Sequence, residues 1–260
     1  MAAIIHKIKD NLFDLYENYG VKGIKVDFEA EIVGLEELFS LKDVLNQLDL
    51  DLTVKIGGCE AVKDLHEAYS VGAKKIVAPM IESEYALKKF INAAKQVFDE
   101  VSLFINIETK TAYNNLENII SSRYFDELDG VVIGRGDLTE SLDLERHNVN
   151  SSEVFNIALD IINQVKTRNK TCIIGGHLCP KSIDFFNKLP DNTIDGYETR
   201  NVIFDYQKAR LTDQIEGIVK ALEFEILWTH YKYEKTGLMH SLDKKRLKNL
   251  EDRIGYLKIR

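Results

Sequence analysis

The sequence predicts one α/β domain with the (β/α)8 architecture of a TIM barrel. Its 260 residues match the usual length of a single barrel, and 45% apolar residues provide for a full core. Short β-branched apolar runs alternate along the chain with amphipathic stretches of helical period. This alternation is typical of βαβ units, in which parallel strands are buried on both faces.

The strand pattern accounts for seven of the eight strands that such a barrel needs. The predicted strands are Gly23–Phe28, Leu52–Ile56, Lys75–Ala78, Ser102–Ile107, Gly130–Ile133, Thr171–Ile174 and Thr193–Tyr197. Residues Ala3–Ile8 are a candidate for the missing strand, but the helical pattern of Ile8–Tyr19 competes for them. We therefore expect an irregular or missing first strand.

The stretches between these strands predict helices with one apolar face. They are Glu60–Ser70, Ser83–Phe98, Glu108–Ser121 and Ser152–Thr167. Ser83 is placed to cap the second of these helices, and Ser151 or Ser152 is placed to cap the last.

The predicted barrel occupies residues 1–204, and residues 205–260 form a helical extension that is interrupted near Gly237. Apolar positions of this extension, from Ile215 to Leu227, would cover the barrel or a neighbouring subunit. We therefore expect a homo-oligomer.

Composition narrows the classes of partner and location. The net charge of −8 disfavours binding to a phosphate backbone, so no nucleic-acid partner is expected. Three cysteines without C-x-x-C spacing suggest a reducing, cytoplasmic location. The N-terminus has no signal-like apolar run, and no window approaches the roughly 20 apolar residues of a membrane span, so no membrane partner is expected.

Polar residues gather where the predicted strands end, which is where the active site of a parallel barrel forms. Acidic residues at such positions can also be simple helix caps, since they suit the helix dipole. The whole set is harder to explain in that way, because every strand end carries a charged group or an imidazole and several carry glycines. The candidates are Lys55, Glu82, Glu108, Arg135, Gly136, Asp137, His177 and Arg200.

Glu108 and Asp137 follow neighbouring strands and suggest a metal site. Two carboxylates with open positions left over suit Mg²⁺ or Mn²⁺, whose octahedron is completed by water or substrate oxygens. Such a metal could bind the keto and carboxylate oxygens of a 2-oxo acid and favour loss of a methyl proton.

At these residues the sequence resembles the HpcH/HpaI aldolase/citrate lyase β family, which belongs to the phosphoenolpyruvate/pyruvate-binding barrels. The resemblance covers most of the chain and is clearest in Asn106-Ile-Glu-Thr and Asp129-Gly-Val-Val-Ile-Gly-Arg-Gly-Asp-Leu-Thr. Gly72-Ala-Lys-Lys-Ile-Val-Ala-Pro-Met80 is similar to a further family strand. The resemblance implies that Glu108 and Asp137 are the metal ligands.

Two positions depart from the family pattern. The family aldolases have a D-x-E-H strand end whose histidine takes part in proton transfer, and Ala30 stands at that position here. An arginine of the family that stabilises the enolate is replaced by Lys55, which keeps the charge but loses the bidentate fork. The enolate could still be stabilised, whereas the family's acid–base route is in doubt.

Other residues are candidates for the missing roles. His177 is placed for proton transfer, although it could equally be a loop histidine without a catalytic role. Arg200 could bind a substrate carboxylate or phosphate, or it could pair with Glu198 or another neighbour. Arg135 could orient the site or bridge loops, and backbone amides near Gly136 could bind carboxylate. Glu82 is a further substrate-binding candidate, with a helix cap as its alternative.

The leading hypothesis is a metal-dependent carbon–carbon lyase or aldolase that acts on a small, pyruvate-like 2-oxo acid through an enolate. Lys55 would stabilise the enolate, and a Schiff base on Lys55 is a less favoured chemistry. One alternative is a citrate-lyase-like lyase or hydrolase of CoA thioesters. Another is a non-catalytic barrel that binds a metal or a 2-oxo acid, or serves as an assembly subunit, which Ala30 and Lys55 favour.

Overall fold

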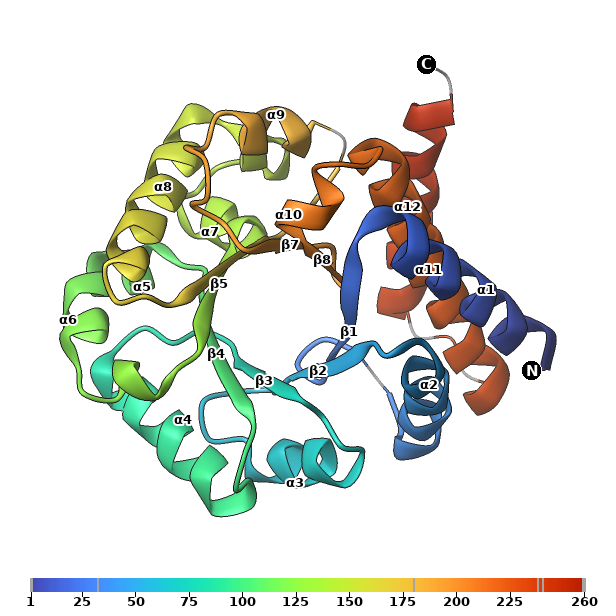
Figure 1. Cartoon of the computed structure of the whole chain (residues 1–260), viewed down its shortest axis with the longest axis horizontal. Coiled ribbons are helices and arrows are strands. Elements are labelled where there is room, and N and C mark those ends of the chain that lie inside the picture. Colours follow the sequence, from blue (N-terminus) through green and yellow to red (C-terminus); the bar gives the residue numbers. More distant parts are fainter. Residues whose placement is uncertain (1, 32, 180, 238, 240, 259–260) are drawn as a thin grey trace.

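The computed structural model describes residues 2–31, 33–179, 181–237, 239 and 241–258. Its strands form one closed barrel in the order β1 to β8 (Figure 1). Neighbouring strands from β1 to β7 are parallel, as the alternating pattern predicts. The strands are β1 (Val21–Asp27), β2 (Asp51–Lys55), β3 (Lys75–Ala78), β4 (Ser102–Ile107), β5 (Gly130–Gly134), β6 (Thr171–Gly175), β7 (Gly196–Glu198) and β8 (Val202–Asp205).

The eighth strand lies elsewhere than expected. Residues Ala3–Ile8 belong to helix α1 (Ala2–Tyr19), and β8 instead follows β7 after a short turn. In that turn the backbone N–H of Thr199 donates to the oxygen of Val202, and the Thr199 hydroxyl accepts from the Val202 N–H. The chain therefore reverses, and β8 runs antiparallel to both β7 and β1.

Helices cover the outside of the barrel, as Figure 1 shows. Beyond α1 they are α2 (Leu35–Leu48), α3 (Val62–Ser70), α4 (Glu84–Val97), α5 (Lys110–Asn114), α6 (Leu116–Ser121), α7 (Arg135–Ser141), α8 (Ser152–Lys166), α9 (Ser182–Asn187), α10 (Tyr206–Ala209), α11 (Gln214–Thr236) and α12 (Ser241–Lys258), with 3₁₀ turns η1 (Phe125–Glu127) and η2 (Arg146–Asn150).

The predicted caps of two helices are confirmed. The hydroxyl of Ser83 accepts from the N–H of Ala86 at the start of α4, and that of Ser151 accepts from Val154 at the start of α8. The predicted helix Glu108–Ser121 is divided into α5 and α6 at Asn115.

The barrel interior has an apolar layer below a polar one. Five buried side chains fill the middle of the barrel, namely Val77, Phe104, Val132, Ile173 and Ile203. Side chains alternate between the two faces of a strand, so residues two positions later also face inward, nearer the carboxyl ends of the strands. Those residues include Asn106, Gly134 and Gly175, all of which line a cavity at this end. The two-residue period of the strands therefore places the apolar layer directly below the residues that line the cavity.

The C-terminal helices are present as expected. Helix α11 contacts both α1 and α12, and α1 contacts β1 (Figure 1). Gly237 ends α11 with a left-handed φ of +68°, which glycine adopts without steric cost. The division of the chain at residue 204 stays a prediction. No helix among the described residues has the length and apolar character needed to cross a membrane.

Candidate active site

A cavity of about 670 Å³ lies at the carboxyl ends of the strands and is partly covered by α12. It brings together six of the eight predicted site residues, which come from five different strand ends. These residues are Lys55, Glu108, Gly136, Asp137, His177 and Arg200. Helix α12 adds Lys245, Arg246, Asn249, Leu250, Asp252 and Arg253 to the wall.

Glu108 is held in a defined position at the end of β4. One carboxylate oxygen accepts from the backbone N–H of Met80 at 3.1 Å, and the other accepts from the side-chain amide of Asn106 at 2.7 Å. Met80 has a φ of +51°, an unusual conformation for a residue with a side chain, and its N–H reaches Glu108 in that conformation. A Cβ at Gly134 would lie 2.6 Å from the Glu108 carboxylate, so glycine leaves the space that this side chain needs.

Glu108 and Asp137 influence each other electrostatically. Burial raises the pKa of Glu108 to about 7, with the charge of Asp137 adding to the rise and Lys55 opposing it. Asp137, in the first turn of α7, is exposed to the cavity. Two neighbouring carboxylates of this kind are stabilised as anions by a cation between them.

Lys55 supplies a positive charge in the part of the cavity near Glu108. Its ammonium group pairs with Glu29 and lies near Glu108 and Asp27. Burial lowers the pKa of Lys55, but these three carboxylates outweigh burial, and the net pKa is raised. The side chain therefore stays protonated, which disfavours the neutral amine that Schiff-base formation requires.

His177 lies in the loop after β6 and lines the same cavity. Its Nε2 accepts a hydrogen bond of 2.5 Å from Arg146 Nε. Burial lowers the pKa of His177 to about 3, and the positive charges of Arg146 and Arg253 add to this effect. The imidazole is therefore neutral at physiological pH. Its proposed role in proton transfer stays a prediction.

The backbone around His177 is tightly packed. Gly176 and His177 both have positive φ, +84° and +47°. A Cβ at Gly136 would lie 2.9 Å from His177 Cδ2, and one at Gly176 would lie 2.3 Å from the Gly136 nitrogen. Glycine at these two positions lets the loop after β6 approach the start of α7 closely.

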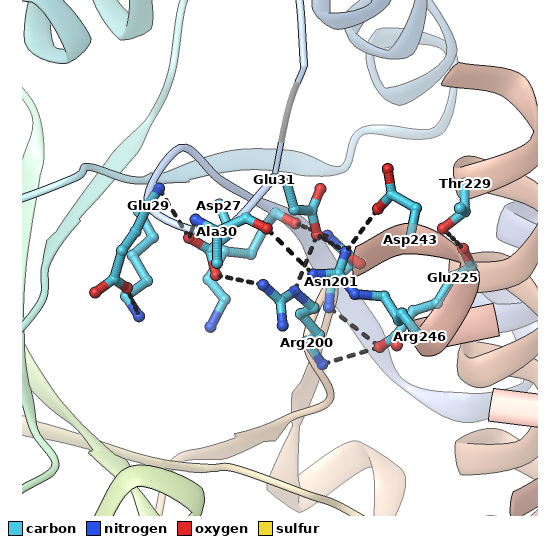
Figure 2. Close-up of polar contacts among 12 residues, drawn as sticks. Asp27, Glu29, Ala30, Glu31, Arg200, Asn201, Glu225, Thr229, Asp243 and Arg246 are labelled. Atoms are coloured by element: carbon cyan, nitrogen blue, oxygen red, sulfur yellow. Dashed lines mark hydrogen bonds and ion pairs between the residues drawn. The ribbon is translucent and has the colours of Figure 1, made fainter. Parts of the chain in front are cut away.

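Arg200 follows β7 and lies close to two acidic residues, Asp27 at the end of β1 and Glu31 in the loop after it (Figure 2). Its guanidinium is 3.3 Å from Asp27 and 3.1 Å from Glu31. The Glu31 carboxylate also accepts a hydrogen bond from the Asn201 side-chain amide and forms ion pairs with Lys232 and Arg246, at distances of 3.0 to 3.3 Å. The charge of Arg200 is thus already balanced by the protein, although the residue still lines the cavity.

Arg135 and Glu82 are placed differently from the other candidates, since neither is among the described residues that line the cavity. Arg135 is fully buried, and its guanidinium donates to the carbonyl oxygens of Gly175 and Gly176 and stacks on Phe185. It therefore connects loops, which was one of its two expected roles. The Glu82 carboxylate accepts from the hydroxyl of Thr109 at 2.5 Å. The substrate-binding roles of both residues are untested.

Several residues that line the cavity were not predicted from the sequence. Asn106 could have been found, because it precedes Glu108 by two positions on a strand and so shares its face. The buried Lys25–Glu198 pair follows from the same period on β1 and β7. Arg246 and Arg253 belong to a helix far along the chain, and nothing local indicates that α12 reaches the cavity.

The donor set fits an oxygen-preferring divalent cation. No group of three or more His, Cys, Asp or Glu side chains suited to a metal occurs in the described part of the chain, so the protein would offer Glu108 and Asp137 and leave other positions to substrate or water. The Asn106 side-chain oxygen is buried in the cavity wall without a hydrogen-bond partner among the described residues. A further oxygen donor is therefore available beside Glu108.

Comparison with known proteins identifies the family. A sequence model of the HpcH/HpaI aldolase/citrate lyase family matches residues 43–174, about half of the chain. The chain belongs to this family. The HpcH/HpaI match includes Lys55, Glu108 and Asp137, and the family is one of aldolase- and lyase-type enzymes. A search of curated proteins gives no significant match.

Solved structures agree with this HpcH/HpaI assignment at the level of the fold. An HpcH/HpaI aldolase from Desulfitobacterium hafniense has a TM-score of 0.58 and 13% identity, covering 70% of this chain and 78% of that one. A family protein from Burkholderia cenocepacia has a TM-score of 0.54 and 12% identity, covering 70% and 88%. Citrate synthase SbnG has a TM-score of 0.53 and 15% identity, covering 67% and 84%.

Proposed function

We propose that this chain is a divalent-metal-dependent carbon–carbon lyase or aldolase that acts on a small 2-oxo acid, such as pyruvate, through its enolate. The observation that carries the proposal is the placement of Glu108, Asp137 and Lys55 in one cavity at the barrel mouth. Glu108 and Asp137 would hold Mg²⁺ or Mn²⁺, which when bound supplies Lewis-acid polarisation of the keto group.

Lys55 would stabilise the enolate that forms when the 2-oxo acid loses a proton or a carbon substituent. Its raised pKa keeps the ammonium charged, and its burial strengthens its interaction with the negative charge that develops on the substrate. The backbone of Gly136 lines the cavity and would orient the substrate carboxylate, whereas Arg200, which also lines the cavity, would have to exchange Asp27 or Glu31 for the substrate to do so.

Proton transfer would differ from the route that the family histidine provides, because Ala30 offers no titratable group. His177 is the imidazole available in the cavity wall, and it is neutral, as a proton acceptor must be. Its Nε2 is already engaged by Arg146, so transfer through this atom requires that hydrogen bond to break. A water molecule in the cavity is the alternative acceptor.

Deuterium exchange of the pyruvate methyl group tests this proposal without a second substrate. Wild type should catalyse exchange in the presence of Mn²⁺, and Asp137→Asn should lower the rate at least about 100-fold. Asp143→Asn is the matched control, because Asp143 is an exposed turn residue with a φ of +58°, which asparagine tolerates. Equal exchange in wild type and Asp137→Asn would refute the proposed chemistry.

A citrate-lyase-like reaction on a CoA thioester is the second candidate. The cavity of about 670 Å³ has room for more than a three-carbon acid, which favours a larger acyl substrate. A ligand screen that compares CoA thioesters with 2-oxo acids separates the two reactions. The third possibility is a non-catalytic binding or assembly subunit. It would be favoured if the protein binds Mn²⁺ and no 2-oxo acid changes its affinity for Mn²⁺.

A further inference from the structure

The guanidinium groups of the cavity wall differ in how their charges are balanced. Arg200 pairs with Asp27 and Glu31, and Arg246 pairs with Glu31 and Asp243. For Arg146 and Arg253, by contrast, the described residues offer no carboxylate oxygen within 4.0 Å. Within the described part of the chain, these two cavity arginines therefore form no ion pair, and Glu225 acts on Arg253 only from beyond that distance.

Arg146 and Arg253 converge on one short segment after β6. Arg146 donates to the imidazole of His177, and Arg253 donates to the carbonyl oxygen of Leu178. Their charges also contribute to the lowered pKa of His177, after burial. Both acceptors are neutral groups, so these hydrogen bonds position the two arginines without neutralising their positive charges.

This basic cluster lies across the barrel from Lys55, the proposed enolate-stabilising residue. Lys55 ends β2, whereas His177 and Leu178 follow β6, and these strands are opposite each other in the closed order of eight. Both groups line one continuous cavity of about 670 Å³. A three-carbon 2-oxo acid beside Lys55 would leave the volume near Arg146 and Arg253 for a second molecule.

We propose that Arg146 and Arg253 bind an oxyanion, a carboxylate or a phosphate, on the second reactant of the lyase, and that α12 thereby forms part of the substrate site. Identifying this ligand as a second reactant rests on the proposed function. Planar guanidinium groups match both kinds of oxyanion, and the partly buried position of Arg253 strengthens the pairing. This assigns anion recognition to residues whose charge is available, whereas Arg200 already has two acidic partners.

Aldehyde selectivity tests the assignment in the intact protein. In the condensation, the enolate carbon bonds to the aldehyde carbon, and the aldehyde oxygen takes the C=O electron pair and a proton from water. Pyruvate is combined with glyceraldehyde 3-phosphate or glyceraldehyde, and with 4-oxobutanoate or butanal. We expect kcat/KM to favour the charged member of at least one pair about 10-fold or more, and the favoured pair shows which oxyanion fits.

Arg146→Met and Arg253→Met should each lower that preference by about 10-fold or more, because the neutral aldehyde makes no use of either guanidinium. Lys248→Met is the matched control, since Lys248 is exposed on α12 and is not among the cavity-lining residues. Arg146 is exposed and belongs to η2, so its replacement should leave the packing of α12 intact. No preference in wild type, or an unchanged preference in both arginine variants, would overturn the assignment.

Direct binding separates this inference from the proposed function. If wild type shows no methyl exchange with pyruvate, the proposed chemistry fails, and calorimetry with inorganic phosphate and with succinate still tests the cluster. We expect wild type to bind at least one of these anions, and both arginine variants to bind it about 10-fold more weakly or not at all. Absence of binding in wild type, or equal binding in the variants, would refute an oxyanion site.

Discussion

Arg246 Nη1 lies 3.2 Å from the Glu31 Oε1 atom and joins the C-terminal helix to the loop after β1. The Glu31 side chain is fully buried, and Figure 2 shows it next to Arg200 and Arg246. Lys232 of α11 contacts the other oxygen at 3.3 Å. One carboxylate therefore joins both C-terminal helices to the loop after β1, and its contact with Arg246 helps to place α12 at the cavity.

Replacing Glu31 by glutamine should destabilise the protein strongly. The change leaves Arg200, Lys232 and Arg246 facing a neutral amide, and breaking a buried ionic group in this way costs about 3–5 kcal/mol. Urea unfolding measures the loss. Glu36→Gln is the matched control, because Glu36 makes an exposed ion pair with Lys235 that is worth about 1 kcal/mol or less. Similar losses in both variants would show that the Glu31 cluster does not hold the helices.

The same carboxylate predicts a dependence of stability on pH. Burial opposes ionisation of Glu31, but Lys232, Arg246 and Arg200 outweigh it and lower its pKa below the ordinary value of 4.5. Its contribution is therefore present above about pH 4.5 and is lost as pH falls through the lowered pKa of the folded state. The difference in unfolding free energy between wild type and Glu31→Gln should be constant from pH 5 upward and shrink in more acidic solution. A constant difference down to pH 3 would contradict this.

Lys55 should affect turnover more than substrate binding. Lys55→Met should lower kcat for pyruvate methyl exchange about 100- to 1000-fold, because a fixed positive charge in the site acts mainly on the negative charge that develops during reaction. Lys55→Arg keeps the charge and should retain most of the activity. Steady-state kinetics of the three proteins measure both parameters. A raised KM with unchanged kcat in Lys55→Met would assign Lys55 to simple substrate binding.

Gly134→Ala should disturb the metal site without changing any charge. The added methyl group would lie 2.6 Å from the Glu108 carboxylate and would force that side chain to move. We expect Mn²⁺ affinity to fall about 10-fold or more, because metal ligation depends on ligand position. Gly58→Ala is the control, since nothing lies within 4 Å of its added Cβ. Unchanged affinity in Gly134→Ala would mean that Glu108 is free to shift.

The barrel could be predicted from sequence because its signal is local. The runs Lys75–Ala78 and Ser102–Ile107 are strands with the predicted bounds, and both helix caps formed as expected. The antiparallel β8 was not predicted, because its direction depends on the hydrogen bonds of the Thr199 turn and not on its apolar pattern. The tail beyond Asp205 is largely helical, as expected.

The strand ends of the site could be predicted, whereas the charge balance could not. Sequence order places Lys55, Glu108 and His177 at one end of the barrel. It does not show that Arg200 is balanced by Asp27 and Glu31, because these residues lie far from Arg200 in sequence and meet it only through tertiary contacts. For the same reason Arg253, from the last helix, could not be recognised as a cavity residue.

The most direct test of the account is calorimetric titration with Mn²⁺ at pH 8, where Glu108, with its pKa of about 7, is ionised. Wild type should bind one equivalent, and Asp137→Asn and Glu108→Gln should each weaken binding about 100-fold or more, with Asp143→Asn unchanged. Wild-type affinity in either cavity variant, or no binding in wild type, would contradict the claim that these two carboxylates share a cation.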